Sequence, residues 1–433
     1  MKKIFLLITI CLANSSVFAQ RVLTQDSCRI LARLNAEEIQ KSQNAVNEAS
    51  YTYKNAQTSV LPSIDGSANM LFMFPDIDIS GSDLIIKGTY TAGITLTQPL
   101  YTGGKISTGI KLAKAGQECA GLMQKKTTAE VIAEVDNSYF TCIAVREKIK
   151  MLEQYLLQVK HLEDVVQQSI DAEMSTQHDL MRVKAKRSEL EYNLAKAKNG
   201  YNLCRMALAN AIGADFNEEI IPADTVLTVE IPADLSADIS QRPEIQLLEK
   251  QVEIKERQIQ MQRSDALPIV AVSAGYTYCG NIKMEGVAQG PDGNYYPYSQ
   301  KFDQGMTMIM LTAQVPLFHW GQNSRNVKKA KLEAEDARLD LKKNSKLLSI
   351  ETSQAVQNLT DGYSMVLTAQ LGLSESEENL RIATDKYENQ MSTLTDLLDA
   401  QSQWQQSFSN LIEAQTQYKI YQTEYLKKTG RLE

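Results

Sequence analysis

The chain has 433 residues, a formal net charge of −7 and a mean hydropathy of −0.28. It contains no basic cluster, which excludes nucleic acid as an expected partner. Histidines and cysteines are scattered without ligand-like spacing, and there is no nucleophile–base pair or glycine-rich phosphate loop. The sequence therefore predicts no cofactor, no metal site and no enzymatic activity. We interpret the cysteines beyond Cys11 as small buried apolar residues.

The N-terminus has the pattern of a secretory signal peptide. Two lysines precede an apolar run that ends at Ala13, and small residues at Val17 and Ala19 precede a cleavage site before Gln20. The run is shorter than the roughly 20 residues of a membrane-spanning helix. We expect residues 1–19 to be removed on export; the alternative is a buried N-terminal helix. No other segment predicts a transmembrane helix, so the exported chain would be periplasmic, secreted or a β-barrel.

The first half of the mature chain predicts long helices on either side of a strand pair. No proline lies between Pro99 and Pro222, and a proline inside a helix costs about 3 kcal/mol. Within this stretch apolar residues follow a coiled-coil-like seam: Ile149, Leu152, Leu156, Val159, Leu162, Val166 and Ile170. The predicted elements are a helix at about 24–60, strands at about 64–74 and 88–98, a long helix at about 104–173 and a helix at about 177–212. The long helix would span ~105 Å, which argues against the alternative of an ordinary bundle core.

Three of the predicted strands alternate apolar residues with small or polar ones, and the fourth, at about 306–315, alternates less cleanly and is assigned its outward row by alignment with the second strand. This alternation over about ten residues is typical of transmembrane β-strands, although a single such strand would also fit a soluble sheet. We expect loops at Pro75–Lys87 and Asn281–Gln304 to join the hairpins. The expected outward rows are Ile64, Gly66, Ala68, Met70, Phe72 and Phe74; Tyr90, Ala92, Ile94 and Leu96; Val270, Val272, Ala274, Tyr276 and Tyr278; and Ile309, Leu311 and Ala313.

The chain contains an internal duplication. Gln98-Pro99-Leu100-Tyr101 matches Val315-Pro316-Leu317-Phe318, and Met174-Ser175-Thr176 matches Met391-Ser392-Thr393, both at an offset of 217 residues. Upstream, Leu61-Pro62 matches Leu267-Pro268 at an offset of 206 residues. The predicted repeats are 20–213 and 242–433, joined by a segment at 214–241. The second repeat predicts helices at about 242–266, 321–390 and 394–429, and strands at about 269–280 and 306–315.

Four strands are too few to close a membrane barrel, because about eight is the smallest usual number. Three copies would supply twelve, and closure would remove the unpaired edges that lipid does not tolerate. The sequence therefore predicts an oligomer, most simply a homotrimer. Tyr101, Phe318 and Trp320 lie just past the strands, where an aromatic girdle at the lipid boundary is expected.

The whole mature chain resembles the TolC-type outer-membrane efflux proteins. The resemblance rests on the duplicated unit, on the strand-to-helix transitions and on the segment Met391 to Ala400. It implies a mainly α fold with a membrane β-barrel portion, in which a trimeric 12-stranded barrel continues into a periplasmic α-helical barrel. It also implies outer-membrane lipid, a periplasmic membrane-fusion adaptor and an inner-membrane pump of the RND or ABC type as partners. The transition residues are Pro99, Gly104, Pro316 and Gly321.

Comparison of the two repeats separates candidate structural residues from candidate functional ones. Thr176 and Asp179 have capping-box spacing, as do Thr393 and Asp396, so these aspartates could simply cap helices. Asp399 replaces an arginine and Tyr387 replaces an isoleucine of the first repeat. Asp396 and Asp399 are three residues apart and would share one helix face. In a trimer they would form six carboxylates that attract cations; the alternative is solvated surface aspartates.

The resemblance sharpens this interpretation. Some family members narrow the periplasmic entrance with two aspartates at the positions of Asp396 and Asp399, and they lock it through a tyrosine, an arginine and an aspartate. Tyr387 and Asp179 match two of these three residues, but the arginine position is Ser392. Another contact must therefore lock the gate, or the gate is looser. The helix turns at the periplasmic tip are candidate adaptor-docking sites: Met174, Ser175, Thr176, Met391, Ser392 and Thr393.

The sequence thus predicts an outer-membrane channel with a large periplasmic portion, serving as the exit duct of a tripartite efflux or type I secretion system. The main alternative is a structural protein, a trimeric coiled-coil adhesin or periplasmic spacer without pore activity. Long helices and export fit that class. The strand hairpins in both repeats do not, because a stalk requires none.

Overall fold

The computed structural model describes residues 21–75, 77–79, 82–216, 218–231 and 235–432. The expected signal peptide, residues 1–19, lies outside this described part. No helix among the described residues is both long and apolar enough to span a membrane.

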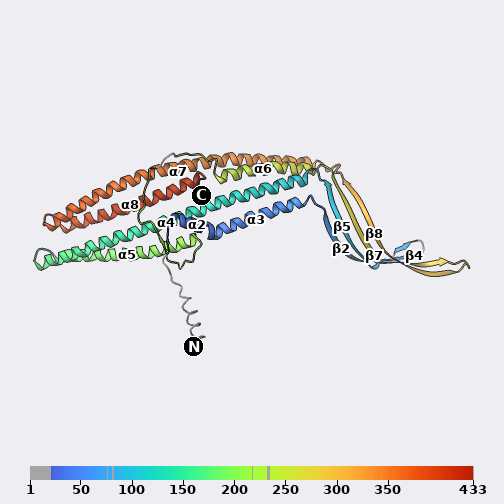
Figure 1. Ribbon diagram of the computed structural model, residues 1–433, viewed down its shortest axis with the longest axis horizontal. Helices are drawn as coiled ribbons and strands as arrows, with labels where there is room; N and C mark the ends of the chain where they lie inside the picture. Colours follow the sequence, from blue (N-terminus) through green and yellow to red (C-terminus); the bar gives the residue numbers. More distant parts are fainter. Residues whose placement is uncertain (1–20, 76, 80–81, 217, 232–234, 433) are drawn as a thin grey trace, which may run out of the picture. The chain divides into compact units, whose positions relative to one another are not determined.

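The elements of the two repeats follow the same order (Figure 1). The first repeat contains β1 (Arg21–Leu23), α2 (Gln25–Asn35), α3 (Glu37–Thr58), β2 (Ser63–Phe72), β3 (Ile77–Ile79), β4 (Ser82–Ile85), β5 (Lys87–Tyr101), α4 (Lys105–Asp171) and α5 (Gln177–Ala211). The connecting segment and second repeat contain β6 (Ile220–Pro222), α6 (Pro243–Ser264), β7 (Ile269–Gln289), β8 (Tyr295–Gln314), α7 (Gln322–Glu388) and α8 (Leu394–Lys428).

The duplication is reproduced in the helix lengths. Both α4 and α7 have 67 residues, and both α5 and α8 have 35. The duplicated helix–hairpin–long helix–helix unit expected from the sequence is therefore confirmed.

Two expected boundaries differ from the observed ones. The helix expected at 24–60 is interrupted at Ala36, which is extended, with φ −60° and ψ 125°. The loop expected at 281–304 is largely strand, because β7 and β8 continue pairing as far as Gln289 and Tyr295. Valine and tyrosines in this stretch favour a strand, and only the turn around Gly290–Asn294 remains. Within the expected loop 75–87, β4 pairs with β7.

The chain divides into two compact units, and each unit combines parts of both repeats. The helical unit is built from the described residues of Met1–Val46, Ala120–Leu248 and Leu341–Glu433. The sheet unit is built from the described residues of Asn47–Cys119 and Glu249–Asp340. A repeat in the sequence is thus not a compact body by itself.

In the sheet unit, the four long strands are antiparallel in the order β2-β5-β7-β8. The register places the predicted apolar rows opposite one another: Ile64 pairs with Leu96, Ile94 with Tyr276, and Ala274 with Ile309. Directly paired residues of an antiparallel sheet point to the same face, so the four rows form one apolar face. Ile64, Ile94 and Ile309 are exposed on it, by 69%, 62% and 76%. In the described chain, β2 and β8 each pair along one side only, which leaves two open edges.

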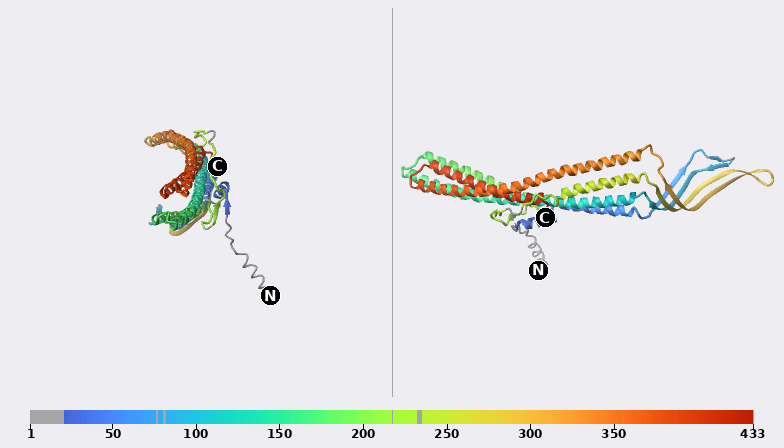
Figure 2. Two further views of the ribbon diagram at one scale, coloured as in Figure 1. Left: turned by 90° about the vertical axis from the view of Figure 1, so that its left-hand side faces the viewer. Right: turned by 90° about the horizontal axis from the view of Figure 1, so that it is seen from above.

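In the helical unit, α5 lies beside the C-terminal part of α4, and α8 lies beside that of α7 (Figures 1 and 2). The predicted seam is buried here, with Leu152, Leu156, Val159, Leu162 and Val166 all 9% exposed or less. It packs with leucines of α5 and α8 in one core cluster, and the Tyr155 ring meets the Trp404 ring edge-on at 6.0 Å. Cys28 and Cys142 are buried in a second cluster, and burial raises the pKa of each thiol to about 12.

Candidate functional site

The two helix turns of the helical unit have the same backbone geometry. Glu173 and Gln390 close α4 and α7 with positive φ angles of 63° and 61°. The next residues, Met174 and Met391, donate their amides to carbonyls five residues back, each at 2.7 Å. Both methionines are exposed, by 60% and 75%. The structure therefore presents the six predicted tip residues on two equivalent turns.

Hydrogen bonds of the helix caps engage two of the predicted gate carboxylates. Thr393 and Asp396 form a complete capping box, in which the Asp396 carboxylate accepts from the Thr393 amide at 3.0 Å. These bonds hold the pKa of Asp396 below its usual range. In the first repeat the Asp179 carboxylate accepts from the Thr176 hydroxyl at 2.8 Å. Asp396 thus has a capping role in α8, whereas the Asp179 carboxylate is engaged by the hydroxyl of Thr176, the N-cap residue of α5.

Asp399 differs from Asp396. It is exposed on α8, and in the described part of the chain no hydrogen bond or ion pair holds its carboxylate. Its counterpart in the first repeat, Arg182, donates from Nη1 to the Thr395 hydroxyl at 2.7 Å. This bond joins α5 to the first turn of α8, and so links the two repeats beside the turns. No local sequence pattern indicates this bond, because the partners are 213 residues apart.

The charge of Asp179 acts on the hydroxyl of Tyr387. Tyr387 is half-buried against the core cluster of the helical unit. Burial, and then the negative charge of Asp179, raise the pKa of the Tyr387 hydroxyl. Ser392, at the expected arginine position, is half-buried, and its hydroxyl oxygen has no hydrogen-bond partner among the described residues. Asp179 is therefore near enough for its charge to act on Tyr387, and the third predicted lock position, Ser392, carries no charge.

A buried ion pair that sequence reasoning missed ties α2 to α4 and α8. Arg29 donates two hydrogen bonds to the carboxylate of Asp136, at 2.9 and 2.5 Å, and Thr423 donates a third at 2.9 Å. The Asp136 side chain is 0% exposed and that of Arg29 is 21% exposed. The bonds to Asp136 raise the pKa of the Arg29 guanidinium. This network joins α2 and α4 of the first repeat to α8 of the second.

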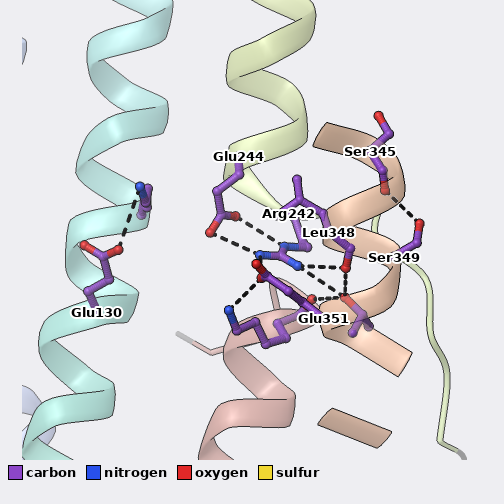
Figure 3. A network of polar contacts seen from close by, with 10 residues as sticks. Glu130, Arg242, Glu244, Ser345, Leu348, Ser349 and Glu351 are labelled. Carbon is purple, nitrogen blue, oxygen red and sulfur yellow. Dashed lines mark hydrogen bonds and ion pairs between the residues drawn. The ribbon is translucent and has the colours of Figure 1, made fainter. Parts of the chain in front are cut away.

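A second network surrounds Arg242, which is 1% exposed (Figure 3). Its guanidinium faces the carboxylates of Glu244 and Glu351 at 3.4 and 3.3 Å and donates to the Leu348 carbonyl at 3.2 Å. Lys428 of α8 also donates to Glu351, at 2.7 Å. The network joins the start of α6 to α7 and α8.

This second network predicts a dependence of stability on pH. The hydrogen bond from Lys428 is the largest of several effects that hold the pKa of Glu351 below 4.5. A depressed pKa contributes stability above about pH 4.5, and the contribution is lost as pH falls through the lower folded value. We expect Glu351→Gln to be less stable than wild type near neutral pH, by about 1 kcal/mol because the carboxylate is partly exposed. The gap should close below pH 4.5; a gap that stays constant in urea unfolding across this range would contradict the expectation.

The strand-to-helix transitions also share a geometry in the sheet unit. Pro99 pairs with Ala271 near the end of β5, whereas Pro316 follows β8. Gly104 directly precedes α4, and Gly321 directly precedes α7. Their φ angles are 82° and 76°. Trp320 has a positive φ of 51° and is 81% exposed, which is a genuine outlier for a bulky residue. Its ring lies edge-on to Phe318 at 5.0 Å, consistent with the expected aromatic boundary.

Among the described residues, no group of three or more His, Cys, Asp or Glu side chains could hold a metal ion.

The chain matches the family model described as outer membrane efflux protein over residues 30–214 and 235–430, which covers most of both repeats. No curated protein sequence matches it. Three solved structures illustrate the fold. The outer membrane protein VceC of Vibrio cholerae is 15% identical, with a TM-score of 0.77 over 94% of this chain and 96% of that one. The Campylobacter jejuni outer membrane channel CmeC is 18% identical, with a TM-score of 0.75 over 94% and 85%. The open-state Neisseria gonorrhoeae outer membrane channel MtrE is 18% identical, with a TM-score of 0.75 over 96% and 93%.

These matches favour a channel over the adhesin or spacer alternative, and the family and fold are those of channel proteins rather than enzymes. The fold is that of outer-membrane channels with a β-barrel and an α-helical tunnel, to which one chain contributes an open sheet. Members of the family are trimeric channels that work with adaptors and inner-membrane pumps. The chain belongs to the outer membrane efflux protein family.

Proposed function

We propose that three copies of this chain form an exit duct across the outer membrane for a tripartite efflux or type I secretion system. The observation that carries the proposal is the sheet: four strands share one apolar face, and β2 and β8 leave open edges. Pairing β8 of one copy with β2 of the next would close twelve strands and satisfy both edges in lipid. The apolar face would then meet lipid acyl chains.

The periplasmic end of the duct carries the gate in this proposal. Asp399 is the principal charge, because its carboxylate is exposed and unengaged in the described part of the chain, whereas Asp396 is held by its capping box. Three copies would place three such carboxylates around one passage and attract cations. The Arg182–Thr395 hydrogen bond replaces the missing arginine contact at Ser392 as the lock between α5 and α8. Tyr387 and Asp179 stand beside it.

The two exposed turns are proposed to dock a periplasmic adaptor, which would in turn connect the duct to an inner-membrane pump. Met174 and Met391 project from equivalent turns, and polarizable methionines adapt well to partner surfaces. In a trimer, six turns would offer the adaptor a ring of quasi-equivalent contacts.

The gate charge is tested with a matched pair of variants. Asp399→Asn should lower the cation-over-anion permeability ratio by at least about twofold, because a ring of carboxylates is neutralised. Asp179→Asn should change that ratio less, since this carboxylate is already engaged by the Thr176 hydroxyl at the start of α5. Reversal potentials under a salt gradient measure both ratios. Equal effects of the two substitutions would contradict the assignment of Asp399.

A further inference from the structure

A cavity of about 180 Å³ lies between α4, α7 and α8 in the helical unit. Its most deeply buried lining residues are Leu162, Leu397 and Gln401, which are 6%, 2% and 4% exposed. Its rim includes the exposed residues Gln158 and His161. It has therefore a buried interior and an opening to solvent.

The interior contains one unusual polar atom. The Oε1 atom of Gln401 is buried and has no hydrogen-bond partner among the described residues. Leaving a buried acceptor unsatisfied is destabilising, and native structures contain few such atoms. Because Gln401 lines the cavity, a molecule inside it could supply the missing donor.

The remaining walls are mainly apolar. They include Leu162, Val165, Leu380, Leu397 and Tyr387. An apolar cavity of about 150 Å³ is large enough for benzene, so a volume of about 180 Å³ admits one aromatic ring with a small substituent. Glu388 also lines the cavity but is exposed, so a charged ligand would lose its hydration inside without a buried counter-charge, which favours a neutral ligand.

We propose that this cavity is a binding site for a small neutral aromatic molecule carrying one hydroxyl or N–H donor, which it donates to Gln401 Oε1. The ring packs between the leucines of α4, α7 and α8. The bound molecule also lies against Tyr387, at the C-terminal end of α7, and Leu397, which follows Asp396 in α8. The site is independent of the proposed duct function, because binding can be measured without any conductance.

The chain offers an internal probe of this site. It has two tryptophans, and Trp404 lies one helical turn from Gln401 and is 6% exposed. In Trp320→Phe, Trp404 is the single tryptophan, so its emission reports on the cavity. Phenol and anisole are the two ligands, since they share a ring but only phenol can donate a hydrogen bond. Excitation at the red edge of tryptophan absorption avoids both ligands, and saturation-transfer NMR gives an independent reading of binding.

We expect saturable binding of both ligands to the purified full-length protein, with phenol about two- to tenfold tighter, the worth of one hydrogen bond. Gln401→Leu in the same background should abolish this preference while anisole still binds. Gln403→Leu, at an exposed position two residues along α8, is the matched control and should keep the preference. Val165→Phe fills the cavity and should weaken the binding of both ligands at least tenfold. Any signal that remains in this variant measures partition of the ligands into detergent.

Three results would overturn the proposal: no saturable binding of phenol, equal affinity for phenol and anisole in the parent protein, or binding unaffected by Val165→Phe. The absence of saturable phenol binding would indicate that water fills the cavity. If Gln401→Leu does not form folded trimers, two measurements still test the proposal. These are the comparison of phenol with anisole in the parent protein and the effect of Val165→Phe on binding. Conductance of the same preparations is scored separately, so failure of the binding site and failure of the duct are distinguishable.

Discussion

Asp136→Asn is expected to lower the free energy of unfolding by about 3 kcal/mol or more, because it leaves the charge of Arg29 without its buried partner. The Asp136 side chain is fully buried and accepts three hydrogen bonds, from Arg29 and Thr423. The remaining exposure of Arg29, 21%, keeps the cost toward the lower end of the range for buried pairs. Urea unfolding at a fixed protein concentration measures the change, since subunit assembly contributes to the apparent stability.

Two controls separate charge from packing in this network. Thr423→Val removes one neutral donor and should cost about 1 kcal/mol. The double variant Arg29→Met/Asp136→Leu removes both charges and should recover much of the loss, because apolar replacements of a buried pair are often tolerated. A double variant as unstable as Asp136→Asn would show that the ion pair is not the source of the effect.

Gly430→Ala and Gly213→Ala are each expected to destabilise the protein by about 2–5 kcal/mol. Both glycines follow a long helix with positive φ angles, 71° and 68°, where a side chain costs about 1–2 kcal/mol. A Cβ on Gly430 would lie 2.6 Å from the Gln241 carbonyl oxygen, and one on Gly213 would lie 2.6 Å from the Asn35 carbonyl carbon. The crowding adds about 1–3 kcal/mol, as overpacking does elsewhere.

Gly200→Ala is the matched control, because Gly200 lies inside α5 with no atom within 4 Å of an added Cβ. Alanine there should stabilise by about 0.5–1 kcal/mol through helix propensity. Unfolding midpoints of the three variants, measured side by side, test the prediction. Equal behaviour of Gly200→Ala and Gly430→Ala would contradict it.

These two glycines also make equivalent contacts in the two repeats. Gly213 packs on residues 35 and 36, and Gly430 packs on residues 241 and 242. The two glycines are 217 residues apart in the sequence, and the residues that they contact are 206 apart. These are the two offsets found in the sequence. The same contact is thus built twice, and the close backbone approach leaves no room for a Cβ at either position.

Local patterns predicted the parts of the fold that depend on local physics. The seam from Leu152 to Val166 is buried as its helical spacing indicated, and the apolar rows of the four strands share one face. The break at Ala36 and the extension of β7 and β8 were missed. The backbone at Ala36 lies close to Gly213, and this long-range contact has no local sequence pattern.

Long-range polar contacts were the least predictable part of the candidate site. The Arg29–Asp136 pair spans 107 residues, and Arg182 and Thr395 are 213 residues apart. The residues around each member of a pair do not indicate its partner, because the pairing depends on how distant helices pack together. By contrast, the capping box of Thr393 and Asp396 could be predicted from spacing alone, since a cap involves residues within one turn.

The central claim, a gated duct through the outer membrane, is tested most directly by single-channel recording in a planar bilayer. Purified trimers of wild type and of Arg182→Ala, which lacks the Arg182–Thr395 hydrogen bond, should both give cation-selective openings. Openings of Arg182→Ala should be the more frequent, because the proposed lock between α5 and α8 is removed. Folded trimers of both proteins that insert into the bilayer and never conduct would contradict the claim.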